Sequence, residues 1–157
     1  MIDLTYPEPT SKAAALYATH TGRSNFIVVG YKNGERTDGY VNVIGAYEGT
    51  VLIDSADQLQ IKADGPWRVE LRPLFSQPQL VTHAEGHGDQ VLVYLGSRGV
   101  LALTHDGTSN FIVHSITSRG SNGLVNEIGP YTGKVPLAAG PGFIEVLADG
   151  NWTLDIT

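Results

Sequence analysis

The sequence predicts an all-β protein with two tandem antiparallel β-sandwich, jelly-roll-like units that are related by internal duplication. Two observations predict this fold: three sequence blocks that recur in order, and many short β-branched and aromatic runs separated by turn residues. The chain has 157 residues, of which 41% are hydrophobic and 17% charged, with 19 glycines and 8 prolines. A globular chain of this length can form one ordinary domain or two small ones.

The repeat consists of three pairs of matching blocks. THTGRSNFIV matches THDGTSNFIV at an offset of 85 residues, with eight identities. VNVIGAYEGTV matches VNEIGPYTGKV at an offset of 84 with seven identities, and ADGPW matches ADGNW at 85 with four. Because order and spacing are both kept, we predict two repeats, residues 1–72 and 73–157, which differ by one residue between the first two blocks.

The second repeat divides into eight short predicted strands, a number typical of a sandwich. They are Gln79–His83, Gln90–Leu95, Val100–Thr104, Ser109–Ile116, Leu124–Ile128, Gly133–Leu137, Phe143–Leu147 and Trp152–Ile156. The Asp64–Gly65 and Asp149–Gly150 pairs are typical of tight hairpin turns. Ala13–Ala18 has the composition of a helix, but its counterpart in the second repeat contains a β-branched valine, which favours a strand in both.

The first repeat is shorter at its N-terminus. An offset of 85 places Met1 opposite Gly86, so nothing in it corresponds to Gln79–His83. The segment IDLTY supplies only a weak counterpart of Gln90–Leu95, and prolines follow it. A sandwich without one strand has an open edge, and we therefore expect another chain to complete the first repeat.

Eight residues mark equivalent positions of the two repeats: Asn25, Asn42, Tyr47, Trp67, Asn110, Asn126, Tyr131 and Trp152. We predict that the two tryptophans cover one end of a core, with an exposed sugar site as the alternative. We expect the four asparagine side chains to bond turn backbone, and the tyrosines to lie over the sandwich edge. These markers are interpreted as scaffold.

Composition narrows the classes of function. A formal charge of −6 provides no basic surface for nucleic acid. The chain has no cysteine and no apolar run long enough to enter a membrane. No signal peptide is recognisable, and Met1 indicates that the chain begins where its gene begins.

The sequence marks no catalytic, metal or cofactor site. G-x-S-x-G and phosphate-binding loop motifs are absent, as is any EF-hand pattern. His20 and His105 recur, but neither has a second histidine nearby at metal-ligand spacing. His83 and His87 have the spacing of two ligands on a helix, yet their glycine-rich surroundings disfavour a helix.

The segments GTSNFIV, LVNEIGPYTGKVPL and FIEVLADGNWTLDI resemble a β-sandwich module of actinobacterial proteins. That module has a G-x-G-D start, a THDG-x-SNF strand, an LVN-x-IGPY-x-G hairpin and a closing ADG-x-W strand. The resemblance covers Gln77–Thr157 well and Thr19–Leu71 more loosely. It implies a fold without an agreed activity, and a secreted or cell-surface setting. In general character, the chain also resembles a bacteriophage virion component.

We expect a non-enzymatic structural or interaction protein, located on a virion surface as a capsid decoration or tail protein. Its expected partner is a second copy of itself or a larger assembly such as a capsid. The alternative is a carbohydrate- or envelope-binding module of an actinobacterial surface protein, with Tyr31, Tyr40 and Tyr94 lining a face for a surface glycan. An enzyme is the third class.

Overall fold

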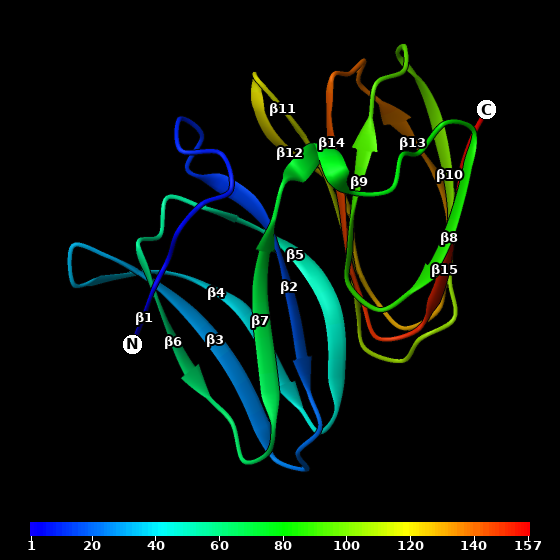
Figure 1. Cartoon of the computed structure of the whole chain (residues 1–157). Helices are drawn as coiled ribbons and strands as arrows, with labels where there is room; N and C mark the ends of the chain where they lie inside the picture. The colour runs from blue at the N-terminus through cyan, green and yellow to red at the C-terminus, as the bar shows by residue number, and fades with distance from the viewer. The chain divides into compact units, whose positions relative to one another are not determined.

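The computed structural model describes the whole chain, residues 1–157, and shows an all-β protein whose one helical segment is a short 3-10 turn, η1 (Leu74–Ser76). The chain divides into two compact units, Met1–Ser76 and Gln77–Thr157, each with two antiparallel sheets (Figure 1). The sequence placed the boundary slightly earlier, between residues 72 and 73. No helix of the structure is both long and apolar enough to cross a membrane.

The second unit has the strand order of an eight-stranded jelly roll. One sheet has the order β12-β11-β14-β9 and the other β13-β10-β15-β8. The strands are β8 (His83–His87), β9 (Gln90–Tyr94), β10 (Gly99–His105), β11 (Asn110–Thr117), β12 (Gly120–Ile128), β13 (Tyr131–Leu137), β14 (Gly142–Ala148) and β15 (Asn151–Ile156).

The first unit repeats this order with one strand fewer. Its sheets have the orders β4-β3-β6-β1 and β5-β2-β7, so β1 corresponds to β9 and β7 to β15, while β8 has no counterpart. The strands are β1 (Ile2–Asp3), β2 (Ala13–His20), β3 (Asn25–Lys32), β4 (Glu35–Ile44), β5 (Tyr47–Asp54), β6 (Gln58–Lys62) and β7 (Trp67–Arg72).

The registers of the two units correspond residue by residue at the repeat markers. His20 lies opposite Trp67 across the β2–β7 pair, and His105 lies opposite Trp152 across β10–β15. The extra residue of the first repeat lies in the β3–β4 hairpin. That hairpin has two register shifts where β11–β12 has one.

The structure corrects two local predictions. Gln79–His83 is not a strand: Gln79 forms a single parallel bridge to Val93, and the strand that follows is His83–His87. The two Asp-Gly pairs are not hairpin turns, because β6 and β7 belong to different sheets, as do β14 and β15. The predicted IGPY-x-G hairpin likewise passes from β12 in one sheet to β13 in the other. The remaining strands of the second repeat lie within about two residues of their predicted bounds, except that β12 begins earlier, at Gly120.

Alternating apolar residues of both sheets form the core of the second unit. Every other residue of β10, β11 and β14 is buried, as expected when one face of each strand contacts the opposite sheet. The central members are Leu101, Leu103, Phe111, Val113, Ile144, Val146, Trp152 and Leu154, with Leu80 added from the segment before β8. In the first unit Ala13–Ala18 lies in strand β2, which confirms the strand prediction.

Candidate functional site

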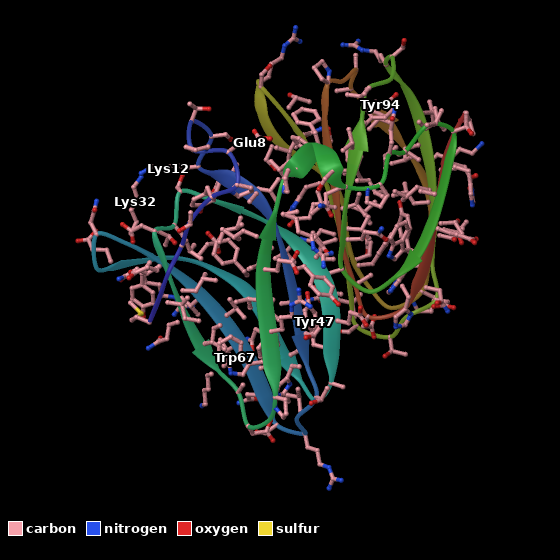
Figure 2. All side chains as sticks on the ribbon, viewed as in Figure 1. Glu8, Lys12, Lys32, Tyr47, Trp67 and Tyr94 are labelled. Atoms are coloured by element: carbon pink, nitrogen blue, oxygen red, sulfur yellow. The ribbon has the colours of Figure 1, made fainter.

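The two repeated tryptophans differ sharply in exposure. Trp152 is 1% exposed and belongs to the core of the second unit, as predicted. Trp67, at the equivalent start of β7, is 43% exposed, so the prediction that it covers a core is wrong (Figure 2). An exposed tryptophan at a sheet edge is costly to leave in water and is typical of binding surfaces.

Strand β8 is the reason for the difference. It pairs with β15 and places Gly86 directly opposite Trp152. A Cβ at Gly86 would lie 2.4 Å from the Trp152 indole, so only glycine lets the strand pass this close. The Trp152 indole nitrogen also donates to the Gly88 carbonyl at 2.9 Å. The first unit has no equivalent of β8, and nothing covers Trp67 in this way.

The segment before β8 fills the core of the second unit. Leu80 is 1% exposed, and its backbone N–H donates to the Val93 carbonyl at 2.9 Å. The first unit lacks this leucine as well, and a pocket of about 270 Å³ opens there. Its apolar lining consists of Ile2, Leu4, Leu16, Leu59, Val69 and Leu71. Four of these residues, Ile2, Leu16, Leu59 and Val69, occupy the same register positions as Leu92, Leu101, Ile144 and Leu154 of the second unit. In the second unit those four residues pack with Leu80 in the core.

The free edge of β7 borders this pocket. The Thr21 N–H donates to the Pro66 carbonyl at 3.0 Å, so the backbone groups of Pro66 point toward β2. In an antiparallel pair this direction alternates along the strand, and the even-numbered residues of β7 therefore point their backbone groups toward β2 as well. The N–H and C=O groups of Trp67, Val69 and Leu71 therefore point outward. In the second unit the equivalent groups pair with β8, as shown by the Ile156 N–H donating to the Thr82 carbonyl at 2.8 Å.

The N-terminal segment does not cover this edge. β1 pairs with β6, which lies in the opposite sheet of the first unit. Leu4 N–H continues that contact by donating to the Asp57 carbonyl at 2.9 Å, and the Tyr6 hydroxyl donates to the Ala56 carbonyl at 2.8 Å. Residues 1–10 thus substitute for β9 and leave β7 unpaired.

Charged residues lie on the other face of β7. Arg68 Nη2 lies 2.6 Å from Glu70 Oε2, and Arg72 Nε lies 3.2 Å from Glu70 Oε1. The hydrogen bond from Arg72, together with the charges of both arginines, lowers the pKa of Glu70, which is therefore ionised at neutral pH. The edge thus combines an apolar inner face with an outer face that carries both signs of charge.

In each unit a buried histidine lies against a partly exposed aspartate, a pairing that the sequence did not indicate. The His20 ring stacks on Phe26 with 4.8 Å between centroids, and its Nδ1 lies 2.8 Å from the Gly45 carbonyl. Its Nε2 lies 3.2 Å from Asp64 Oδ1, at ion-pair distance but without hydrogen-bond alignment. His105 and Asp149 repeat this arrangement with a separation of 3.3 Å.

The aspartates also hold the turns that precede β3 and β11. Asp149 Oδ2 accepts from the backbone N–H groups of Thr108 and Ser109, each at 3.0 Å. Burial raises the pKa of this carboxyl, but these hydrogen bonds outweigh burial and lower it overall. In each histidine, Nδ1 lies at hydrogen-bond distance from a glycine carbonyl and Nε2 faces the aspartate carboxylate.

The other repeat markers lie outside this cluster. No hydrogen bond is made by the side chains of the four asparagine markers, Asn25, Asn42, Asn110 and Asn126, so the prediction that they hold turns is wrong. The turns are held by Asp64 and Asp149, whose carboxylates each accept two backbone N–H groups. The Tyr47 and Tyr131 rings pack on Phe26 and Phe111, at 5.8 and 5.7 Å.

The aromatic face suggested for a glycan does not form. Tyr94 is 3% exposed in the core of the second unit, whereas Tyr31 and Tyr40 belong to the first unit. Tyr31 and Tyr40 direct their hydroxyls to Gln60 and to the Asp54 carbonyl. His83 and His87 lie on one face of strand β8, where their Nδ1 atoms contact Asp155 at 2.6 Å and Asn151 at 3.1 Å.

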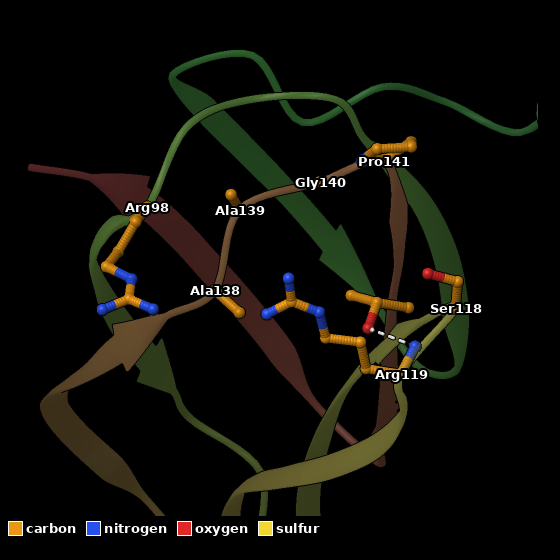
Figure 3. A pocket seen from close by; sticks show the side chains of 8 residues that line it. Arg98, Ser118, Arg119, Ala138, Ala139, Gly140 and Pro141 are labelled. Atoms are coloured by element: carbon orange, nitrogen blue, oxygen red, sulfur yellow. Dashed lines mark hydrogen bonds between the residues drawn. The ribbon is translucent and has the colours of Figure 1, made fainter.

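A second pocket, of about 290 Å³, lies in the second unit between the β11–β12 turn and the segment before β14 (Figure 3). Arg98 and Arg119 both line it, beside Ala138 and the Gly140–Pro141 backbone. Arg119 N–H donates to Thr117 Oγ1 at 3.2 Å, but neither guanidinium has a carboxylate partner. Two unpaired guanidinium groups on one pocket can bind an anion.

Comparison of the sequence with known protein families finds no match, and comparison with curated proteins finds none.

Proposed function

We propose that the protein is a non-enzymatic structural and interaction protein that binds its partner by strand addition at the free edge of β7. One observation carries the proposal: the first unit has the strand order of the second without β8 and Leu80, and its edge and pocket remain open. A partner strand would gain backbone hydrogen bonds from the edge and side-chain specificity from the pocket, as in other β-augmentation complexes.

The setting that we propose is the surface of a bacteriophage virion, where the protein acts as a capsid decoration or tail protein. Jelly rolls occur in viral capsid domains and also in lectins, so the fold supports this setting only by analogy. An open sheet edge that requires a second chain fits a component of a larger assembly, because proteins otherwise cover such edges.

A peptide with the sequence of residues 77–88 tests the strand-addition proposal. It carries the counterparts of both missing elements: Leu80 for the pocket and Gly86 for the position opposite the tryptophan. Added to the full chain, it should shift the fluorescence of exposed Trp67 to the blue and move the amide resonances of β7. The Trp67→Phe variant should lose the fluorescence change, which assigns the signal to the first unit.

The control is the same peptide with Leu80→Asp and Gly86→Val. This peptide keeps the length and most of the composition. Its aspartate cannot fill the apolar pocket, and its valine cannot lie directly against the Trp67 indole. If both peptides bind equally, or if neither perturbs β7 at protein concentrations at which the chain is monomeric, the proposed function is wrong.

The Arg98–Arg119 pocket favours a second candidate function, the binding of an anionic surface glycan. A sulfated oligosaccharide should bind the full chain more tightly than its unsulfated form, and the double substitution Arg98→Ala, Arg119→Ala should remove the difference. Arg23→Ala, which removes an exposed arginine of the first unit, is the matched control. Equal binding of both glycans would contradict this candidate.

A further inference from the structure

The partner of the β7 edge can be inferred from the sequence of the strand itself. This inference rests on the proposed function and names the occupant of the same site. Pro73 directly follows β7 at a position whose backbone groups point to the open edge, and proline has no N–H to donate to a ladder, so an added strand can pair with β7 only as far as Arg72. The question is which strand of six residues fits.

A second β7, related by a twofold axis, fits in one register. Residues directly opposite each other in an antiparallel pair lie on the same face of the sheet, so the axis must pass through a residue. An axis at Val69 places Trp67 opposite Leu71 and Arg68 opposite Glu70. The three residues whose backbone groups point outward then all pair, which gives about six hydrogen bonds in the alternating antiparallel pattern.

The side chains also match in this register. Arg68 and Glu70 have opposite charges and lie at a non-hydrogen-bonded position, where cross-strand side chains approach most closely. On the inner face, each Trp67 lies beside the Leu71 of the second copy, which lines the empty pocket. An axis at Glu70 would instead set Glu70 against Glu70 and Arg68 against Arg72.

We propose that two copies of this chain form a symmetric dimer through antiparallel β7–β7 pairing centred on Val69. Arg68 pairs with Glu70 of the second copy, and each Trp67 enters the other copy's pocket. The two three-stranded sheets β5-β2-β7 become one continuous six-stranded sheet. Of the other edge strands of the first unit, β4 and β5 do not compete, because their counterparts β12 and β13 are equally unpaired in the second unit. The remaining edge strand, β1, has only two residues and offers too short a ladder.

Charge exchange tests the register with the full-length protein. Arg68→Glu and Glu70→Arg each place two like-charged pairs across the axis, and each should weaken dimerisation on the order of tenfold in sedimentation velocity. In a mixture of the two variants, the introduced glutamate faces the introduced arginine and the unchanged Glu70 faces the unchanged Arg68, so dimers should return. The double variant Arg68→Glu, Glu70→Arg should also dimerise by itself.

The control replaces Arg68→Glu by Arg23→Glu, which makes the same charge change on the exposed turn before β3. Because both β7 charges are unchanged in Arg23→Glu, this variant should dimerise as the natural chain does, which assigns the loss in Arg68→Glu to the β7 position and not to the added negative charge. Val69→Pro removes only an outward-pointing N–H and should abolish dimerisation, with circular dichroism reporting whether the strand content is kept. If this variant does not fold, the charge exchange still decides the result.

The outcomes separate this inference from the proposed function. A chain that remains monomeric at all concentrations, or that dimerises without response to the charge variants, overturns the β7 dimer. If the 77–88 peptide still binds β7 of a monomer, the edge is an interaction site for a different chain, and only the second copy is refuted. If the peptide does not bind either, both proposals fail.

Discussion

At the scale of single residues, equal sequence positions have unequal environments. Trp67 and Trp152 follow the same ADG-x motif and occupy the same register position, yet only Trp152 is covered. The difference arises because β8, which the first unit lacks, lies against the Trp152 indole at Gly86, and the Gly88 carbonyl just after β8 accepts the indole N–H. The repeated motif therefore determines where the side chain points and not whether it is buried.

Truncating the two tryptophans should have different consequences. Trp152→Ala should destabilise the second unit by about 3–5 kcal/mol, as large-to-small changes in a core do. Trp67→Ala should leave the unfolding of the second unit unchanged, and should affect the first unit only at protein concentrations at which the β7 edge is occupied. Urea unfolding at two protein concentrations measures both effects. Equal and concentration-independent losses would show that Trp67 is already part of a closed core.

The histidine–aspartate clusters of the two units predict an acid-sensitive fold. The pKa of Asp64 is lowered by hydrogen bonds from the backbone N–H groups of Arg23 and Ser24, and that of Asp149 is lowered as well. A carboxyl whose pKa is lower in the folded state stabilises the fold above its unfolded pKa of about 3.9, and this stabilisation disappears as the pH falls through the folded pKa.

The variants Asp64→Asn and Asp149→Asn should each be less stable than the natural chain at about pH 7 and should lose less stability on acidification to about pH 3. The Asn oxygen is a neutral and therefore weaker acceptor for the two N–H groups than the carboxylate oxygen, and the substitution removes the charge beside the histidine. Urea midpoints across this pH range measure the difference. Parallel curves for variant and natural chain would assign acid sensitivity to other carboxyls.

At the scale of elements, the segment from Pro78 to His87 closes one side of the second unit. Leu80 enters the core, Gln79 bridges to β9, and β8 pairs with β15, so this one segment joins the edges of both sheets. His83 also links β8 to β15, because its Nδ1 lies 2.6 Å from Asp155 Oδ1. The hydrogen bond to this carboxylate raises the pKa of His83. The first unit shows the structure of the same sandwich without this segment.

Leu80→Ala should make the second unit resemble the first. We expect a loss of about 2–5 kcal/mol, because a fully buried leucine is replaced and a cavity remains. Hydrogen exchange of β8 amides should accelerate, since the segment then loses its apolar anchor. Val81→Ala is the matched control, because Val81 is adjacent but 65% exposed. Equal effects of the two substitutions would refute the role of Leu80.

At the scale of the whole molecule, a closed unit and an open unit are present in one chain. The second unit has eight strands and a continuous core, whereas the first has seven strands, and no residue of its edge strand β7 is fully buried. This asymmetry suits a protein in which one unit folds independently and the other is completed on assembly.

Separate expression of the two units tests this division. Residues 77–157 should fold cooperatively with a stability that does not depend on concentration. Residues 1–76 should be less stable and should gain stability with concentration or with the 77–88 peptide, because ligands that bind only the folded state stabilise it. Thermal unfolding at several concentrations provides the measurement. A concentration-independent and equally stable first unit would contradict the asymmetry.

The sequence by itself determined the all-β class, the repeat, most strand bounds of the second repeat and the lack of one strand in the first unit, although it placed the extra strand of the second unit at Gln79–His83 and not at His83–His87. These features are local: alternation of apolar residues, glycine turns and the matching of blocks are all visible along the chain. It also predicted an open edge, because counting strands in two copies of one pattern requires no knowledge of their pairing.

Only the tertiary structure decided which edge is open, that Trp67 is exposed, and that His20 lies against Asp64. In an antiparallel sandwich, strands that pair or face each other are distant in sequence, as Gly86 and Trp152 are, and local patterns do not specify such partners. The Asp-Gly turns show the same limit, since a turn sequence does not reveal whether the next strand pairs with the last or crosses to the opposite sheet. Burial of a given side chain depends on that choice, and so it was decided by the packing of whole strands.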